Sequence, residues 1–253
     1  MHPLLLKIGS IHIYAYGVFI AAAFFAAMGW TMHEASLRGM NKKIIPSLGL
    51  LSLLGGIIGA RLLYIFIDPQ RFTNNLWEIP AIWNGGLVFS GALAGGVLAG
   101  WLTLIEQPRK MQWADAIVPG LALAQGIGRI GCLMAGCCYG DVCTMPWAIE
   151  FTNPQSLAPL YRPLHPTQLY HSLAGILTFF VLVMFRKQLK RTGTASGLFL
   201  VLFSAQRFAI EFFRADYRGE IGIFSATQVA TGLFCILGLT LLFKKHPRSE
   251  RNV

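Results

Sequence analysis

Long apolar runs separated by short polar segments recur along the whole chain. A hydrocarbon core about 30 Å thick requires roughly 20 apolar residues in helical conformation, and seven runs of suitable length are present. We predict membrane-spanning helices near 12–32, 46–67, 86–105, 114–134, 168–185, 196–213 and 224–243. The pattern therefore predicts an all-α, polytopic membrane bundle of seven transmembrane helices, with residues 1–253 forming a single integral membrane domain.

Composition favours a membrane protein over a soluble one. Hydrophobic residues make up 55% of the chain and charged residues only 13%, and the mean hydropathy is +0.56. The net charge of +10 is compatible with nucleic-acid binding, but thirteen of the 21 basic residues lie in four short connections or tails. That distribution is typical of membrane topology, so we expect the lipid bilayer and no nucleic acid as a partner.

Basic residues alternate between successive connections. They follow the first, third, fifth and seventh predicted spans, at 38–43, 109–110, 186–191 and 244–251. The connections 68–85, 135–167 and 214–223 contain few basic residues. Because cytoplasmic loops carry the excess of Lys and Arg, we predict an external N-terminus and a cytoplasmic C-terminus. The first helix is expected to remain as a signal anchor, since no cleavage site is visible near it.

Charged residues within the apolar runs are the first candidates for function. Arg129, Arg207 and Glu211 lie inside predicted spans, and Arg61 and Asp115 lie near the ends of others. A charge in the bilayer costs roughly 2.5–3.5 kcal/mol on insertion scales, so each needs a partner or a ligand. One interpretation is a structural ion pair between Arg207 and Glu211, which are four residues apart on one helical face. The other is that Arg129 and Arg207 bind a lipid phosphate.

Glycine-rich segments surround Arg129 and Ser90. The sequence reads GIGRIGCLMAGCCYG from Gly126 and NGGLVFSGALAGG from Asn84, at the predicted outer ends of two spans. These glycines are compatible with close helix packing alone. Because both segments lie at predicted outer ends, they fall on one side of the membrane, where we expect the site.

Cysteines and histidines near that side leave several alternatives open. Cys132, Cys137, Cys138 and Cys143 follow a C-x4-C-C-x4-C spacing that lacks the usual C-x2-C pairs, so no metal is expected. Disulfides, buried free thiols and a catalytic cysteine beside Arg129 all fit. In the string HPTQLYH, His165 precedes a proline at a predicted helix start. It is a candidate for a role in the reaction or for a structural role at the helix start.

Several of these motifs, taken in order, resemble the prolipoprotein diacylglyceryl transferase family. They are IYAYG at Ile13, WNGG at Trp83, GIGRIG at Gly126, HPTQLY at His165 and SGLFL…R…EFFR from Ser196 to Arg214. The resemblance implies a bacterial inner-membrane enzyme with its active site toward the outer leaflet. It implies transfer of the diacylglyceryl group of phosphatidylglycerol to the lipobox cysteine of a preprolipoprotein, with release of glycerol phosphate. No cofactor is implied.

The resemblance also suggests roles for individual residues. Arg129 and Arg207 match positions that bind the phosphate, Glu211 would orient Arg207, and Tyr16 and Arg214 match further positions at the lipid site. We assign catalytic roles to Arg129, Arg207, Ser90 and His165. We assign substrate-binding roles to Tyr16, Arg61, Glu211, Arg214, Gly131, Gly140, Cys137 and Gln168.

Three departures from the family pattern separate two accounts of the function. Ser90 stands where the family has a histidine proposed as the base, Cys132 and Cys137 replace an asparagine and an acidic residue, and Phe203 replaces a tyrosine. In the first account the same reaction uses another base, such as His165, or water. In the second, the protein serves a different acceptor or is an inactive lipid-binding protein. A transporter is disfavoured because no internal repeat is visible.

Overall fold

The computed structural model describes all of residues 1–253 except 10, 74, 190, 216–219, 222–223 and 245–253. The chain divides into two compact units, one formed by Met1–Gly39 with Ala114–Val253 and the other by Met40–Trp113. The first unit is called the main unit below, and the second the hairpin unit. All intramembrane charges of the sequence except Arg61 belong to the main unit.

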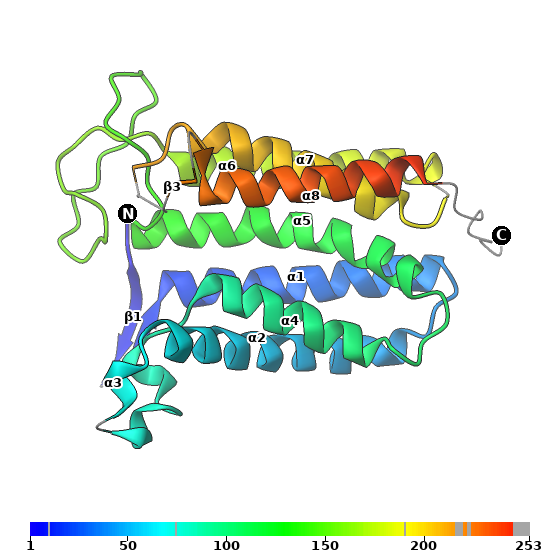
Figure 1. Ribbon diagram of the computed structural model, residues 1–253. Helices are drawn as coiled ribbons and strands as arrows, with labels where there is room; N and C mark the ends of the chain where they lie inside the picture. Colours follow the sequence, from blue (N-terminus) through cyan, green and yellow to red (C-terminus); the bar gives the residue numbers. More distant parts are fainter. Residues whose placement is uncertain (10, 74, 190, 216–219, 222–223, 245–253) are drawn as a thin grey trace. The chain divides into compact units, whose positions relative to one another are not determined.

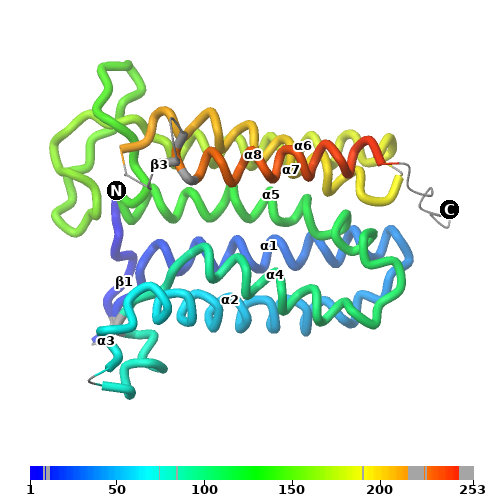
Figure 2. Tube along the Cα trace, viewed as in Figure 1, coloured from blue at the N-terminus to red at the C-terminus, as the bar shows by residue number. Residues whose placement is uncertain are grey.

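The main unit contains five long helices and two short antiparallel strand pairs among its described residues (Figures 1 and 2). In chain order these elements are β1 (Leu4–Ile8), β2 (Ile11–Tyr14), α1 (Ala15–Leu37), α5 (Lys110–Ala135), α6 (Thr167–Met184), η4 (Phe185–Lys187), α7 (Thr194–Glu211), β3 (Glu220–Ile221), β4 (Phe224–Ser225) and α8 (Ala226–Phe243).

Small residues set the spacing of the main-unit helices. A Cβ on Gly120 would lie 2.7 Å from the carbonyl oxygen of Ala27, so α1 and α5 pack backbone to backbone. A Cβ on Gly126 would lie 2.7 Å from Ile176, which brings α6 equally close to α5. Glycine at helix contacts allows such approach in membranes, where van der Waals packing replaces the hydrophobic drive. The apolar core of this bundle consists of Val118, Ala122, Phe179, Leu182 and Ala195.

The hairpin unit is a helix pair with an irregular loop. It comprises η1 (Lys42–Ile44), α2 (Ile45–Ile67), α3 (Gln70–Thr73), η2 (Leu76–Glu78), η3 (Ile82–Asn84) and α4 (Phe89–Thr103). Gly55 and Gly59 of α2 face Gly91 and Gly95 of α4, and a Cβ at any of them would collide with the opposite backbone. The two helices therefore meet along a stripe of glycines.

The seven predicted spans correspond to seven long helices, with corrected boundaries. The first helix begins at Ala15 and not at residue 12, because Ile11–Tyr14 are extended and pair with Leu4–Ile8. It continues to Leu37, and α5 begins at Lys110, four residues before the predicted start. Two strand pairs and the short helix α3 were not predicted. The helical class of the prediction is confirmed.

Four of the helical segments are long and apolar enough to cross a membrane: Ala15–Leu37, Lys42–Ile67, Lys110–Ala135 and Thr167–Lys187. Phe89–Thr103 and Thr227–Phe243 are shorter apolar helices. Large side chains such as Phe25 and Phe66 are 68% and 82% exposed, whereas polar Thr167 and Gln168 are fully buried. Large apolar side chains outside and polar side chains inside are the arrangement that a bilayer favours.

Asp115 connects two helices of the main unit. One carboxylate oxygen accepts from the backbone N–H of Gly193 at 2.6 Å, and the other accepts from the N–H and the hydroxyl of Ser196 at 2.8 and 2.7 Å. These donors belong to the first turn of α7, whose own N-cap residue provides no side-chain acceptor. Asp115 therefore caps α7 from α5, which accounts for a buried carboxylate that the sequence had left unexplained.

We expect Asp115→Ala to lower the free energy of unfolding by on the order of 2 kcal/mol, because three buried donors lose their acceptor. The measurement is the thermal unfolding midpoint of the purified protein in detergent. Asp141→Ala, at an exposed position, is the matched control. Equal midpoints for the two variants would show that the cap contributes nothing to stability.

Candidate active site

Arg129 lies in the last third of α5 and is half-buried. Gly131 allows α1 to approach this part of α5, since a Cβ there would lie 2.9 Å from Phe19. The approach brings Tyr16, at the start of α1, into the electrostatic environment of Arg129. Among the described residues Arg129 makes no hydrogen bond or ion pair. Its guanidinium group is therefore available to bind an anion.

Arg207 is buried in α7 and contacts His171 and Glu211. Its Nη1 lies 2.9 Å from Nε2 of His171 on α6, and its Nη2 lies 3.4 Å from a carboxylate oxygen of Glu211. The other oxygen of Glu211 accepts a hydrogen bond of 3.2 Å from the hydroxyl of Ser225, which precedes α8. Contacts from three helices thus meet at one buried ion pair. Arg207 and Glu211 form the pair that their spacing on one helical face predicts.

The contact with Arg207 fixes the tautomer of His171. A guanidinium group only donates, so Nε2 of His171 must be the acceptor and the proton must lie on Nδ1. We infer this tautomer from the hydrogen-bond network. Nδ1 is buried and has no hydrogen-bond partner among the described residues. A buried N–H donor with no partner is a position where a ligand oxygen gains a hydrogen bond.

The connection from residue 136 to residue 166 packs against the C-terminal end of α5. It has a small apolar core of Phe151, Ala158 and Leu164 against Leu133 of α5. Gly140 of this connection forms an isolated bridge with Arg214, which follows α7 and is only 7% exposed. A Cβ at Gly140 would collide with the backbone of Phe213, so glycine is needed for this approach. The bridge brings Arg214 to the same end of the bundle as Arg129.

The start of α6 holds the chain after α5 in place. Gln168 is fully buried and donates from Nε2 to the carbonyl oxygen of Cys137 at 2.8 Å. Thr167, also fully buried, donates to the carbonyl oxygen of Cys138 at 2.6 Å. Oε1 of Gln168 is buried with no hydrogen-bond partner among the described residues. These two side chains fix the positions of both cysteines.

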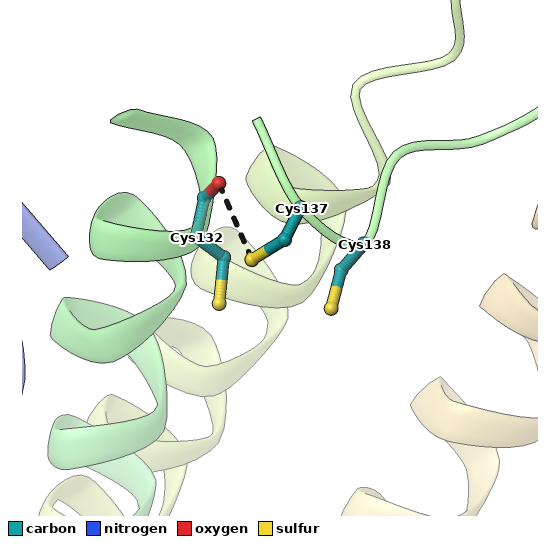
Figure 3. Close-up of side chains that lie close together, drawn as sticks. All are labelled: Cys132, Cys137 and Cys138. Carbon is teal, nitrogen blue, oxygen red and sulfur yellow. Dashed lines mark hydrogen bonds between the residues drawn. The ribbon is translucent and has the colours of Figure 1, made fainter. Parts of the chain in front are cut away.

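Three cysteines lie together at the C-terminal end of α5 (Figure 3). Cys132 lies in the last turn of α5, and Cys137 and Cys138 follow in the loop. The three sulfur atoms lie within 4.8 Å of one another. Cys138 has a φ of 61°, which turns its side chain to the same side as that of Cys137. A left-handed conformation at a residue other than glycine costs on the order of 1 kcal/mol. The protein therefore holds adjacent thiols together against a local preference.

The charge distribution around these thiols favours anions. Hydrogen bonds from Cys132 and Cys137 lower the pKa of the Cys138 thiol, and the charge of Arg129 and a hydrogen bond from Arg214 lower it further against the effect of burial. The hydrogen bonds of Cys137 with Cys132 and Cys138 raise the pKa of the Cys137 thiol. Arg129, Arg207 and Arg214 all act electrostatically on His171. Three arginines act on this one histidine, and Glu211 pairs with one of them, so positive charge predominates among the described contacts of the site.

Two of the residues assigned catalytic roles have other described surroundings. The His165 side chain shares a hydrogen bond of 3.1 Å with the Tyr170 hydroxyl and packs on Phe213, and its backbone pairs with Gly140 and Asp141. Ser90 is exposed at the start of α4 in the hairpin unit. Their catalytic roles stay predictions.

Arg61 has a clear structural role in the hairpin unit. Its guanidinium group donates to the carbonyl oxygens of Ile79, Gly85, Gly86 and Glu78, the first at 2.8 Å. It also lies over the rings of Tyr64 and Phe72. Arg61 therefore anchors the loop between α2 and α4, and its assignment to substrate binding stays a prediction.

Sequence reasoning missed His171 and the grouping of three thiols. The sequence pattern gave no role to His171. The signal was the polar stripe Thr167, Gln168, His171 and Ser172, which lies on one buried face of an otherwise apolar helix. The thiol grouping had no such signal, because it depends on the backbone turn at Cys138.

The helices and this group of arginines and thiols define a helical membrane protein with a basic, thiol-containing site. Residues 3–244 match the family model described as prolipoprotein diacylglyceryl transferase. The chain therefore belongs to the prolipoprotein diacylglyceryl transferase family.

Relatives of similar length are found in bacteria. The chain is 34% identical over 244 residues to a phosphatidylglycerol–prolipoprotein diacylglyceryl transferase of Clostridium tetani, covering 94% of this chain and 96% of the relative. It is also 34% identical over 244 residues to the enzyme of Clostridium perfringens designated 2, covering 96% and 94%. A Symbiobacterium thermophilum relative with the same designation as the first is 33% identical over 246 residues, covering 95% and 91%.

The pKa of Cys138 predicts selective alkylation. A thiolate is present only above its pKa, so lowering that pKa extends the reactivity of Cys138 to well below the usual thiol pKa of about 8.5. We expect iodoacetamide at about pH 6.5 to modify Cys138 before Cys137 in reduced, chelator-treated protein, as measured by peptide mass spectrometry. A rate at Cys138 that rises tenfold per pH unit up to the usual thiol pKa would contradict the lowered value.

Proposed function

We propose that this protein transfers the diacylglyceryl group of phosphatidylglycerol to the lipobox cysteine thiol of preprolipoproteins, forming a thioether and releasing glycerol phosphate. The observation that carries the proposal is that Arg129, whose guanidinium group has no hydrogen bond or ion pair among the described residues, and the buried Arg207 both act electrostatically on His171, in a chain of this family. The relatives' designations name both phosphatidylglycerol and prolipoprotein. The protein is thus a transferase of bacterial lipoprotein biosynthesis.

The arginines act on the phosphate of the lipid. Arg207 is held by His171 and Glu211, so its direction is fixed before a lipid enters. Arg129 adds a charge that no acidic side chain neutralises among the described residues. In the substrate the phosphodiester carries one negative charge, and the departing glycerol phosphate gains a second. Fixed positive groups stabilise that increase more than they stabilise the bound substrate, which is the condition for catalysis.

The remaining assigned residues support the lipid site. Tyr16 and Arg214 lie beside Arg129 and Cys138 respectively. Gly131 and Gly140 allow α1 and the Arg214 segment to approach. Gln168 offers a buried carbonyl oxygen to a hydroxyl of the glycerol group. We assign Cys137 to the part of the site that receives the lipobox cysteine.

The topology follows from the charge pattern of the connections. We propose seven membrane spans in a bacterial inner membrane, with the N-terminus outside and the C-terminus in the cytoplasm. The Arg129 site then faces the outer leaflet, where phosphatidylglycerol enters sideways between helices. A lipobox peptide approaches from the same side.

We expect Arg129→Ala to lower kcat for transfer by about 10²–10³-fold, the usual effect of losing one donor that stabilises developing charge. The assay follows labelled diacylglycerol moving from phosphatidylglycerol to a lipobox peptide in detergent. Arg162→Ala is the matched control, because Arg162 is exposed in the connection that packs against α5. Retained transfer in Arg129→Ala would remove the phosphate role. Wild-type protein that binds phosphatidylglycerol without transfer would favour another acceptor or a lipid-binding protein.

We expect Arg207→Ala to lower kcat for transfer at least roughly tenfold more than Ser90→Ala does. Arg207 supplies a fixed positive charge to the site, whereas Ser90 makes no described side-chain hydrogen bond. Initial rates at saturating lipid compare the two variants, and thermal unfolding midpoints identify any loss of fold. The reverse order would make Ser90 the central residue of the reaction.

A further inference from the structure

The acceptor in the proposed function must lose a proton before it reacts. A free cysteine thiol has a pKa of about 8.5, so most of it is protonated at neutral pH. The His165 ring contacts Tyr170 and Phe213, and Nε2 of His171 accepts from Arg207. Binding to a metal ion deprotonates a thiol outright. A metal at this site would therefore deprotonate the acceptor thiol.

The three sulfur atoms of Cys132, Cys137 and Cys138 have the spacing for such a metal. They lie within 4.8 Å of one another, at the tip of α5 and in the loop after it (Figure 3). Zinc binds cysteine sulfur at about 2.3 Å, which places tetrahedral sulfur ligands about 3.8 Å apart. Closing the triangle by about 1 Å through side-chain rotation therefore forms the site.

The backbone around the triangle is already fixed. Gln168 and Thr167 hold the carbonyl groups of Cys137 and Cys138 from α6. The positive φ of Cys138 directs both adjacent thiols to one side. Cys132 lies in the regular helix α5. Metal sites gain affinity when their ligands are positioned before the ion binds.

We propose that Cys132, Cys137 and Cys138 bind a zinc ion whose fourth position receives the acceptor thiol of the lipobox peptide. This inference rests on the proposed function. Among the described residues, no fourth His, Cys, Asp or Glu joins the group. Three protein ligands with one open position characterise catalytic zinc, whereas structural zinc has four.

The surrounding charges match this arrangement. Zinc with three thiolates carries one net negative charge, and the acceptor thiolate adds a second. Arg129 and Arg214 act on Cys138 and balance these charges. Monovalent copper also prefers thiolates, but three thiolates would leave it more negative and without a position for a fourth.

The chemical step then balances. The acceptor thiol binds zinc and releases its proton to water. Its sulfur attacks the glyceryl carbon attached to the phosphate oxygen, the new C–S bond forms, and the C–O bond breaks with its electron pair moving to the phosphate oxygen. Glycerol phosphate leaves between Arg129 and Arg207. The thioether is neutral and a weaker ligand than the thiolate, so it leaves the metal.

Metal content tests the site without any assay of transfer. Protein purified under reducing conditions and loaded with zinc should hold about one ion per chain, measured by mass spectrometry of the elements. Cys132→Ser, Cys137→Ser and Cys138→Ser should each lose most of it. Cys143→Ser and Cys235→Ser are matched controls outside the triangle and should keep it. Equal zinc in all five variants, or none in the wild type, would overturn the proposal.

Cobalt substitution tests the open position. A lipobox peptide should increase the thiolate-to-cobalt absorption of cobalt-loaded protein, because a fourth sulfur joins the metal, whereas the same peptide with serine in place of cysteine should not. An unchanged spectrum would mean that the acceptor does not bind the metal.

Transfer activity then separates the two proposals. Loss of transfer after chelation and its recovery with zinc would support both. Undiminished transfer by metal-free protein would overturn the zinc inference and leave the proposed function standing. A cobalt response to the peptide without transfer under any metal would overturn the proposed function and leave the site standing.

Discussion

The cost of leaving a charge without a partner in an apolar bundle governs this structure. Asp115 is buried because it caps α7, and Arg61 is buried because four carbonyl oxygens surround its guanidinium group. Arg207 is shared between His171 and Glu211. In each case the charge also holds segments together that are distant in sequence. Charges that would otherwise oppose folding thus determine how the helices meet.

Arg129 differs from these residues in its described contacts, and it is the residue on which the proposed phosphate site is built. Its guanidinium group has no hydrogen bond or ion pair among the described residues, although it lies within an apolar helix. The neighbouring groups are rigid: a fixed Arg207, a bridged Arg214 and thiols held through their backbone. Positive groups held in place are complementary to a phosphate whose charge increases during reaction, because no reorganisation is needed at that moment.

The predictions from sequence succeeded in locating the long helices, since each of the seven apolar runs is helical. Helices must be about 20 residues long to cross the hydrocarbon core, and four of the helical segments are long and apolar enough to do so. The predictions failed at the helix ends. Residues 12–14 belong to a strand pair, because the hairpin of β1 and β2 provides hydrogen bonds that helix periodicity does not reveal. The division into a main unit and a hairpin unit was also not visible in the apolar pattern.

The sequence by itself determined the helical class, the intramembrane charges and the motifs of the family, because hydrophobicity and charge are properties of single residues and short segments. Only the tertiary structure decided how those residues are used. It gave Asp115 and Arg61 structural partners and placed His171 against Arg207. It also joined three thiols whose spacing does not resemble a metal motif. Such groupings depend on a backbone turn and on helix contacts between distant segments, which no local pattern encodes.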